Sequence, residues 1–175
     1  DHLALAGDPG RREAPLAGLT PRFTICAEHD QLALIKDCLR NLGDSHTMVK
    51  PEEARWWIDA AKIRMLGPDQ ASRELPGDRG PLCARVYEQY QQRLLAGDAV
   101  DFDDLILHAV RIFQNHPDVL ERYQERWRYI LVDEYQDTNL AQFELVRLRA
   151  GRHGNICVVG DEDQSIYSWR GADIE

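Results

Sequence analysis

Tyr129-Ile130-Leu131-Val132-Asp133-Glu134 is the stretch from which the fold is most readily inferred. An apolar run that stops abruptly at polar residues is typical of a buried strand. The same texture returns in residues 156–159, which stop at Gly160-Asp161, and residues 140–150 between the two runs have the character of a helix. Strand, helix and strand predict a β-α-β unit with parallel strands. Because neither run alternates apolar with polar residues, we expect a sheet covered on both faces.

Two adjacent carboxylates, Asp133 and Glu134, stand directly after the first predicted strand. In open α/β sheets, ligands bind beyond the carboxyl ends of the strands. One carboxylate there can hold Mg²⁺, usually through water, and the other can orient and deprotonate an attacking water. Nucleotide hydrolysis needs this division of labour. The alternative is that both side chains cap the next helix, and the dipeptide by itself favours that alternative.

The sequence upstream is predicted to be mostly helical. Apolar residues at helical spacing predict helices over residues 30–42, 51–65, 82–95, 101–113 and 117–127. Trp57 lies on one of these apolar stripes and is predicted to be core. We expect a short strand at residues 23–25, a polar loop over residues 67–81 and a linker or disordered lead-in over residues 1–22.

A group of aspartates opens one predicted helix. Asp101 is placed to be its N-cap, with Asp104 at the third helical position in the manner of a capping box. A metal site formed with Asp103 is the alternative, and the capping role is favoured.

Composition restricts the classes of function. The net charge of −9 argues against broad electrostatic capture of nucleic acid, so any DNA contact should be local and rest on stacking. No apolar run is long enough for a membrane span, and the start of the chain has no leader-like pattern. The four cysteines show no metal-ligand spacing, which favours free thiols in a reducing cytoplasm over a zinc site. We expect the chain to be an excerpt from a longer one.

Two blocks near the end of the chain are similar to motifs II and III of the UvrD/Rep/PcrA-type superfamily 1 DNA helicases. They are Asp133-Glu134-Tyr135-Gln136-Asp137-Thr138-Asn139 and the block from Val159 to Asp173, VGDEDQSIYSWRGAD, and the spacing between them also fits. Residues 99–105, 23–36 and 86–95 resemble other parts of the family, so the resemblance covers residues 23–175. It implies an α/β fold: part of a RecA-like P-loop NTPase sheet plus a mostly α-helical inserted subdomain. The implied domains are a lead-in at residues 1–22, the helical insertion at 23–97 and the motor part at 98–175.

The resemblance also implies a role for each matched residue. Asp133 would be the magnesium-associated carboxylate, and Glu134 the general base. Gln136 would belong to the ATP site. Gln136 and Asp137 would both lie behind the residues that contact the nucleotide directly. The implied contacts in the second block are a γ-phosphate sensor, Gln164, and three DNA-binding residues, Tyr167, Trp169 and Arg170.

Part of the DNA-binding role also follows from residue spacing. Tyr167 and Trp169 are two positions apart, so in an extended segment they share a face. Beside Arg170 they would form a stacking surface, on which each base is worth about 1–3 kcal/mol. Without the family, a place in the hydrophobic core is the favoured interpretation of both aromatic residues.

The sequence departs from the family in one respect. The phosphate-binding loop G-x-x-x-x-G-K-[ST] is absent, as none of the three lysines follows such a loop. The resemblance implies that this loop and a second motor domain belong to the rest of a helicase chain. The expected function is therefore part of an ATP-dependent DNA helicase or translocase, moving 3′ to 5′ on single-stranded DNA or at a duplex junction, with Mg²⁺ and ATP. The 175-residue chain alone is expected to be inactive.

Other functions stay open. The chain could be a non-catalytic interaction module derived from such a motor, or the motor part of a helicase–nuclease complex. A metal nuclease built on Asp133, Glu134 and Asp137 is a poorer alternative, because no lysine stands nearby in sequence.

Overall fold

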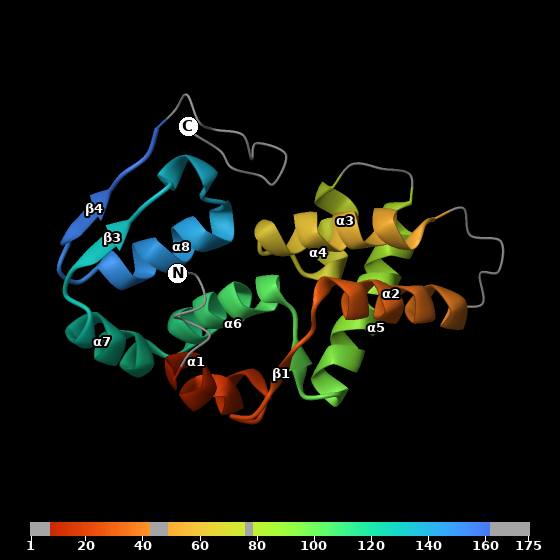
Figure 1. The fold of residues 1–175 in the computed structure, drawn as a ribbon, viewed down its shortest axis with the longest axis horizontal. Coiled ribbons are helices and arrows are strands. Elements are labelled where there is room, and N and C mark those ends of the chain that lie inside the picture. The colour runs from red at the N-terminus through yellow and green to blue at the C-terminus, as the bar shows by residue number, and fades with distance from the viewer. Residues whose placement is uncertain (1–7, 43–48, 76–78, 162–175) are drawn as a thin grey trace. The chain divides into compact units, whose positions relative to one another are not determined.

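The computed structural model describes residues 8–42, 49–75 and 79–161, and the side chains from residue 10 onward (Figure 1). The chain folds into two compact units, Asp1–Leu105 and Ile106–Glu175. The division falls within helix α6 (Phe102–Asn115), whereas the sequence placed a boundary between residues 97 and 98.

The first unit contains a pair of short parallel strands, β1 (Thr24–Ile25) and β2 (Ala99–Val100). Thr24 pairs with Ala99 and Ile25 with Val100. The strand at residues 23–25 was predicted, but its partner was not, because two residues are too short for a period to show. The chain leaves the sheet at the end of β1 and returns to it at the neighbouring strand β2. The residues between the two strands therefore form a structural insertion.

Among the described residues, four helices fill that insertion: α2 (Glu28–Asn41), α3 (Pro51–Ile63), α4 (Pro68–Glu74) and α5 (Gly80–Ala96). They pack on one another around a buried core that includes Ile35, Ile58, Val86 and, as predicted, Trp57. The helices expected near residues 30–42, 51–65 and 82–95 are confirmed.

The expected polar loop over residues 67–81 is wrong for its first half, which forms α4. Pro68 occupies the first helical position, where its missing N–H costs nothing. Ala71 is fully buried and Leu75 nearly so, and α4 packs against α5. Tertiary packing stabilises a helix that the glycines and prolines around it had concealed.

The lead-in is also more ordered than expected. Residues 8–17 form α1 (Asp8–Glu13) and the 3-10 turn η2 (Ala14–Ala17), and Ala14, Leu19 and Phe23 are buried against Val100. The Arg11 guanidinium lies over the Phe23 ring, 4.9 Å from its centroid. Small apolar residues carry little periodicity, so a segment that folds by docking onto a strand was mistaken for a linker.

The second unit contains the predicted β-α-β arrangement. After α7 (Pro117–Arg126) come β3 (Ile130–Val132), a 3-10 turn η3 (Tyr135–Asp137), α8 (Leu140–Ala150) and β4 (Ile156–Val158). The two strands run parallel, with Leu131 opposite Cys157. The mixed helical structure with short parallel strands agrees with the α/β class, and none of the described helices is long and apolar enough to cross a bilayer.

The expectation that this sheet is covered on both faces is not met by the described residues. Leu131 is 72% exposed, Ile156 42% and Val158 49%. A strand pair with a single crossover helix has at most one covered face, which leaves apolar side chains open. In this unit Trp127, which directly follows α7, stacks on Tyr123, and the Arg149 guanidinium of α8 lies 4.3 Å from the centroid of a Trp127 ring.

Candidate active site

The ends of β3 and β4 are joined beyond the last residue of each strand. The Val159 N–H donates to the Val132 carbonyl at 2.8 Å, and the Tyr135 N–H donates to the Val159 carbonyl at 3.0 Å. Asp133 and Glu134 lie between these two hydrogen bonds in sequence. The backbone therefore holds both carboxylates at the carboxyl edge of the strand pair, as the sequence predicted.

Glu134 has an unusual backbone conformation. Its φ of 55° and ψ of 42° lie in the left-handed region, which costs a residue with a Cβ about 1–3 kcal/mol. The Glu134 N–H donates to Asp133 Oδ1 at 3.0 Å, and the Glu134 carbonyl accepts from the Asp137 N–H at 3.0 Å. Met65 and Asp98 also have positive φ, so Glu134 is a functional candidate because it combines this conformation with a place at a strand end.

Gln136 links the two strand ends through its side chain. It is 5% exposed, and its Nε2 donates to Glu134 Oε2 at 2.6 Å. Its Oε1 accepts from the Asp161 N–H at 3.0 Å. Gly160 leaves room for this contact, because a Cβ there would lie 2.7 Å from Gln136 Oε1.

The helix-cap alternative for Asp133 and Glu134 has no support in these contacts. Glu134 precedes η3 but makes no side-chain cap, and α8 is capped by Asn139, whose Oδ1 accepts the Gln142 N–H at 3.0 Å. In turn, the Asn139 N–H donates to Gln142 Oε1 at 3.0 Å. The two carboxylates are thus available for another role.

The electrostatics of the pair suit a hydrated cation. Both side chains are exposed, and within the described ranges no lysine or arginine pairs with either. The described residues also contain no cluster of three or more metal-ligating side chains. Magnesium keeps several waters and takes only one or two carboxylates plus phosphate oxygens. An exposed carboxylate such as Asp133 therefore fits magnesium without further protein ligands.

The structure brings three of the predicted site residues together: Asp133, Glu134 and Gln136. Asp137 lies in the same turn, half-buried, with Oδ1 unbonded among the described atoms. The other predicted residues, Gln164, Tyr167, Trp169 and Arg170, lie outside the described residues.

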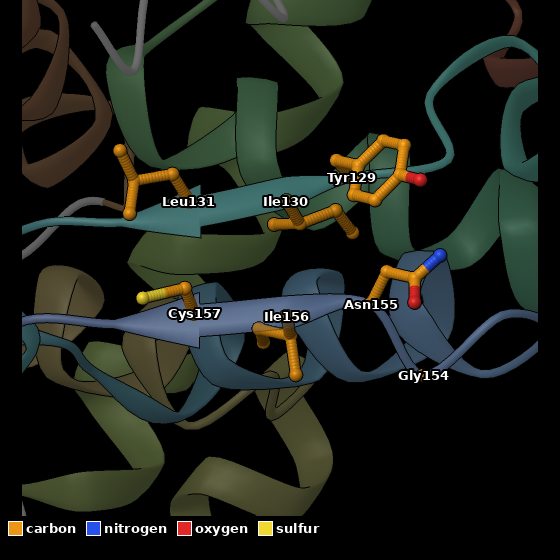
Figure 2. Close-up of a pocket in the computed structure, with 7 residues that line it drawn as sticks. All are labelled: Tyr129, Ile130, Leu131, Gly154, Asn155, Ile156 and Cys157. Atoms are coloured by element: carbon orange, nitrogen blue, oxygen red, sulfur yellow. The ribbon is translucent and has the colours of Figure 1, made fainter.

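A surface hollow of about 470 Å³ lies elsewhere on the strand pair (Figure 2). Its lining comes from the early and middle parts of the strands and the residues before them: Tyr129, Ile130, Leu131, Gly154, Asn155, Ile156 and Cys157. It contains no carboxylate and is not the place where the candidate acid–base groups meet. It reflects the open apolar face of the sheet.

Sequence reasoning missed a second polar cluster, in the first unit. Lys62 of α3 is fully buried, and its Nζ lies 2.5 Å from Asp101 Oδ2 and 2.8 Å from Asp104 Oδ1. The predicted capping box is present as well: the Asp104 N–H donates to Asp101 Oδ1 at 2.9 Å and the Asp101 N–H to Asp104 Oδ2 at 3.3 Å. Lys62 follows Ile58 by one helical turn on the buried stripe of α3, and that position was the signal that it would be buried.

The ionisation of this cluster follows from its contacts. Burial by itself would lower the pKa of Lys62, but Asp101 and Asp104 outweigh it and raise that pKa above its usual range. Burial would raise the pKa of Asp101, yet the Lys62 ammonium holds it below its ordinary value. The Tyr90 hydroxyl donates to Asp101 Oδ2 at 2.8 Å, and burial beside that carboxylate raises the pKa of Tyr90. A cluster so fully enclosed is structural rather than catalytic.

Two parallel strands joined by a helix agree with the α/β class, in which ligands commonly bind beyond the carboxyl ends of the strands. The sequence model for the UvrD/REP helicase N-terminal domain matches residues 6–175. The chain therefore belongs to the UvrD/REP helicase family, as its two sequence blocks indicated.

Named relatives agree. The chain is 44% identical over 165 residues to the ATP-dependent DNA helicase PcrA of Staphylococcus aureus strain Mu50, covering 94% of this chain. It is 43% identical over 165 residues to the protein of the same name from Staphylococcus epidermidis strain ATCC 12228. In both comparisons the chain spans 23% of the relative's length.

Proposed function

We propose that this chain is a segment of the first motor domain of an ATP-dependent DNA helicase, in which Glu134 activates the water that attacks ATP. The observation that carries the proposal is the geometry of Glu134, a left-handed residue at a strand end. Its carboxylate accepts a hydrogen bond from Gln136, and its backbone N–H donates to Asp133. The similarity to proteins named ATP-dependent DNA helicase PcrA supports the same assignment.

The two carboxylates would divide the chemistry. Mg²⁺, when bound, would neutralise charge on the phosphate oxygens, and Asp133 would hold it through its waters. Glu134 would orient the attacking water and accept its proton.

The fold proposed for the whole is a RecA-like P-loop NTPase with a helical insertion. The adjacency of β1 and β2 supports the insertion, since α2 to α5 begin and end at one strand pair. The exposed apolar side chains of β3 and β4 support a larger sheet, because a complete RecA-like domain would cover them. We propose residues 23–97 as the helical insertion and residues 98–175 as the motor part of this domain.

The DNA side of the function rests on the second sequence block. Gln164 is the proposed γ-phosphate sensor, and Tyr167, Trp169 and Arg170 are the proposed contacts to single-stranded DNA or a duplex junction. Their support is the sequence block together with the similarity to DNA helicases. The 3′-to-5′ direction and an action in the cytoplasm are part of the same proposal.

The proposed partner of this segment is the rest of the helicase chain. The phosphate-binding loop and a second motor domain would come from there, because the sequence contains no G-x-x-x-x-G-K-[ST]. Coupling of hydrolysis to movement is therefore proposed for the complete protein.

Replacing Glu134 tests the proposal in the full-length protein. Glu134→Gln keeps the size of the side chain but cannot accept a proton, so hydrolysis should fall by about 10²-fold or more. Nucleotide binding should persist, because the binding groups are unchanged. Steady-state phosphate release and titration with a fluorescent ATP analogue measure the two quantities.

Glu144→Gln is the matched control, since Glu144 belongs to α8 of the same unit and pairs with Arg147 at 2.7 Å. It should leave turnover unchanged. Full turnover in Glu134→Gln would overturn the assignment of Glu134 as the base. Absence of turnover in the unaltered full-length protein would instead favour a non-catalytic module.

A further inference from the structure

We propose that Gln136 is a positioning residue that fixes the Glu134 carboxylate for catalysis and makes its orientation depend on the loop after β4. The inference rests on the proposed role of Glu134 as the base. Gln136 itself is buried and engaged at both ends of its amide, so it acts through Glu134 rather than on the nucleotide.

The orientation of the amide is set by its two partners. Nε2 donates to Glu134 Oε2 at 2.6 Å, whereas Oε1 accepts from the backbone N–H of Asp161 at 3.0 Å. The reversed amide would place an oxygen against a carboxylate and an NH₂ against an N–H, and both contacts would become repulsive. The side chain therefore has one favourable arrangement, with its donor facing the carboxylate.

The backbone around Gln136 leaves little freedom to abandon that arrangement. The preceding residue, Tyr135, donates its N–H to the Val159 carbonyl at 3.0 Å, and its own carbonyl accepts the Thr138 N–H at 3.0 Å. The 3-10 turn that carries Gln136 is thus anchored to the end of β4. A displacement of the loop after β4 would pull on Oε1 at one end of the amide and move Nε2 at the other.

Gly160 shows how closely the two loops approach. A Cβ at this position would lie 2.7 Å from Gln136 Oε1 and 3.3 Å from both the Gln136 backbone nitrogen and Tyr135 Cβ. The contact at 2.7 Å could be relieved only if the amide moved, and movement would break its hydrogen bonds. Gly160 is therefore the residue that permits the link, and a side chain here should disturb Glu134 without touching it.

A carboxylate that must accept a proton from one water needs a fixed direction. Without Gln136 the Glu134 side chain would keep its charge but sample several rotamers, and fewer of them would reach the water. The turnover number should then fall, while ATP binding, which does not use Glu134, should hardly change. A residue that only supported the fold would instead lower the amount of folded enzyme and leave the kcat of the folded molecules normal.

The first experiment compares Gln136→Met with the unaltered full-length helicase. Methionine has nearly the same length but cannot donate or accept these hydrogen bonds. We expect kcat to fall on the order of tenfold or more, and the KM for ATP and the Kd of a non-hydrolysable ATP analogue to stay within about twofold. Gln114→Met is the matched control, because Gln114 Nε2 donates to Glu144 Oε1 at 3.3 Å on the surface of the same unit. It should leave kcat unchanged.

The second experiment asks whether Gln136 works through Glu134. In a Glu134→Gln background, adding Gln136→Met should cause no further loss of kcat, because no carboxylate is left to orient. A further tenfold loss would mean that Gln136 acts independently of Glu134, and it would overturn the inference.

The third experiment uses Gly160 and covers the case in which Gln136→Met does not fold. Gly160→Ala alone should lower kcat with little change in KM, and its effect should shrink in a Gln136→Ala background, where the shortest contact is gone. Equal effects of Gly160→Ala in both backgrounds would contradict the proposed link.

The outcomes separate this inference from the proposed function. Loss of hydrolysis in Glu134→Gln with normal kcat in Gln136→Met would sink the positioning role and leave the base in place. Normal hydrolysis in Glu134→Gln would remove the base and, with it, the role of Gln136.

Discussion

At the scale of single residues, Asp59 is a carboxylate whose ionised form is destabilised by its surroundings. Its side chain is 29% exposed, Oδ1 is buried without a hydrogen-bond partner, and Oδ2 lies 3.8 Å from Arg55 Nε. Burial, then the nearby Asp103 and Asp101 carboxylates, raise its pKa to about 7, against the opposing effects of Arg55 and Lys62. The folded state thus favours protonated Asp59 at a pH where the unfolded chain ionises it.

That pKa gives a pH-dependent prediction. As pH rises from about 4 to about 7, the unfolded state releases the Asp59 proton first, so the free energy of unfolding declines, and the full penalty is present above pH 7. Asp59→Asn removes the titration and should stabilise the chain by roughly 1–3 kcal/mol at pH 8, and by less at pH 5. Urea unfolding at both values measures the difference.

Asp37→Asn, on the surface of α2 and paired with Arg40, controls for the loss of one carboxylate from a helix. If Asp59→Asn shifted stability equally at pH 5 and pH 8, the buried-carboxylate account would be wrong.

At the scale of elements, the Lys62 cluster joins four helices. Lys62 belongs to α3, Tyr90 to α5, and Asp101 and Asp104 cap α6. Gln31 of α2 also donates to Asp101 Oδ2, at 3.2 Å. The inserted helices are thus tied to the residue that directly follows β2.

The cluster also makes folding stability depend on pH. Because the pKa of Asp101 is lowered on folding, its carboxylate stabilises the fold at pH values above its ordinary pKa, and this contribution is lost as pH falls through the folded pKa. Because the pKa of Lys62 is raised on folding, its ammonium stabilises the fold at pH values below its ordinary pKa, and this contribution is lost as pH rises through the folded pKa.

Removing the cation should be costly. Lys62→Met keeps much of the side-chain volume but leaves two buried carboxylates without their partner, which we expect to cost about 3–5 kcal/mol. Lys36→Met, on the exposed face of α2, is the matched control and should change stability little. Thermal unfolding followed by circular dichroism provides the measurement.

Adding Asp101→Asn and Asp104→Asn to Lys62→Met should recover part of the loss, because the unpaired charges disappear. A triple variant no more stable than Lys62→Met would show that packing, not charge, dominates at this site.

At the scale of the whole molecule, the residues proposed for catalysis and the groups needed to hold a nucleotide are separate. Asp133 and Glu134 lie at the edge of a two-stranded sheet whose apolar side chains remain exposed. The sequence contains no glycine-rich loop whose amides and lysine could hold phosphates. Carboxylates alone would repel ATP rather than bind it.

The purified 175-residue chain should therefore show no appreciable ATPase, with or without single-stranded DNA. Phosphate release measured beside the full-length protein checks this expectation. A DNA-stimulated turnover on this chain that disappeared in Glu134→Gln would contradict it, because such a turnover would need a phosphate site within these residues.

Features that depend on neighbours in sequence could be predicted from the sequence. Periodicity placed α2, α3, α5, α6 and α7, and the two apolar runs with the segment between them placed β3, α8 and β4, with the strands in parallel. The capping box at Asp101 and Asp104 was foreseen for the same reason, since its partners are three residues apart. The position of Asp133 and Glu134 at a strand end also followed from local pattern.

Only the tertiary structure decided which distant groups meet. Lys62 lies 39 residues from Asp101, and Gln136 lies 25 residues from Asp161. A hydrophobic period shows which face of a helix is buried but not what that face will contact, so neither pairing could be derived in advance. The left-handed Glu134 is flanked likewise by Val132 and Tyr135, whose backbones hydrogen-bond to the distant Val159.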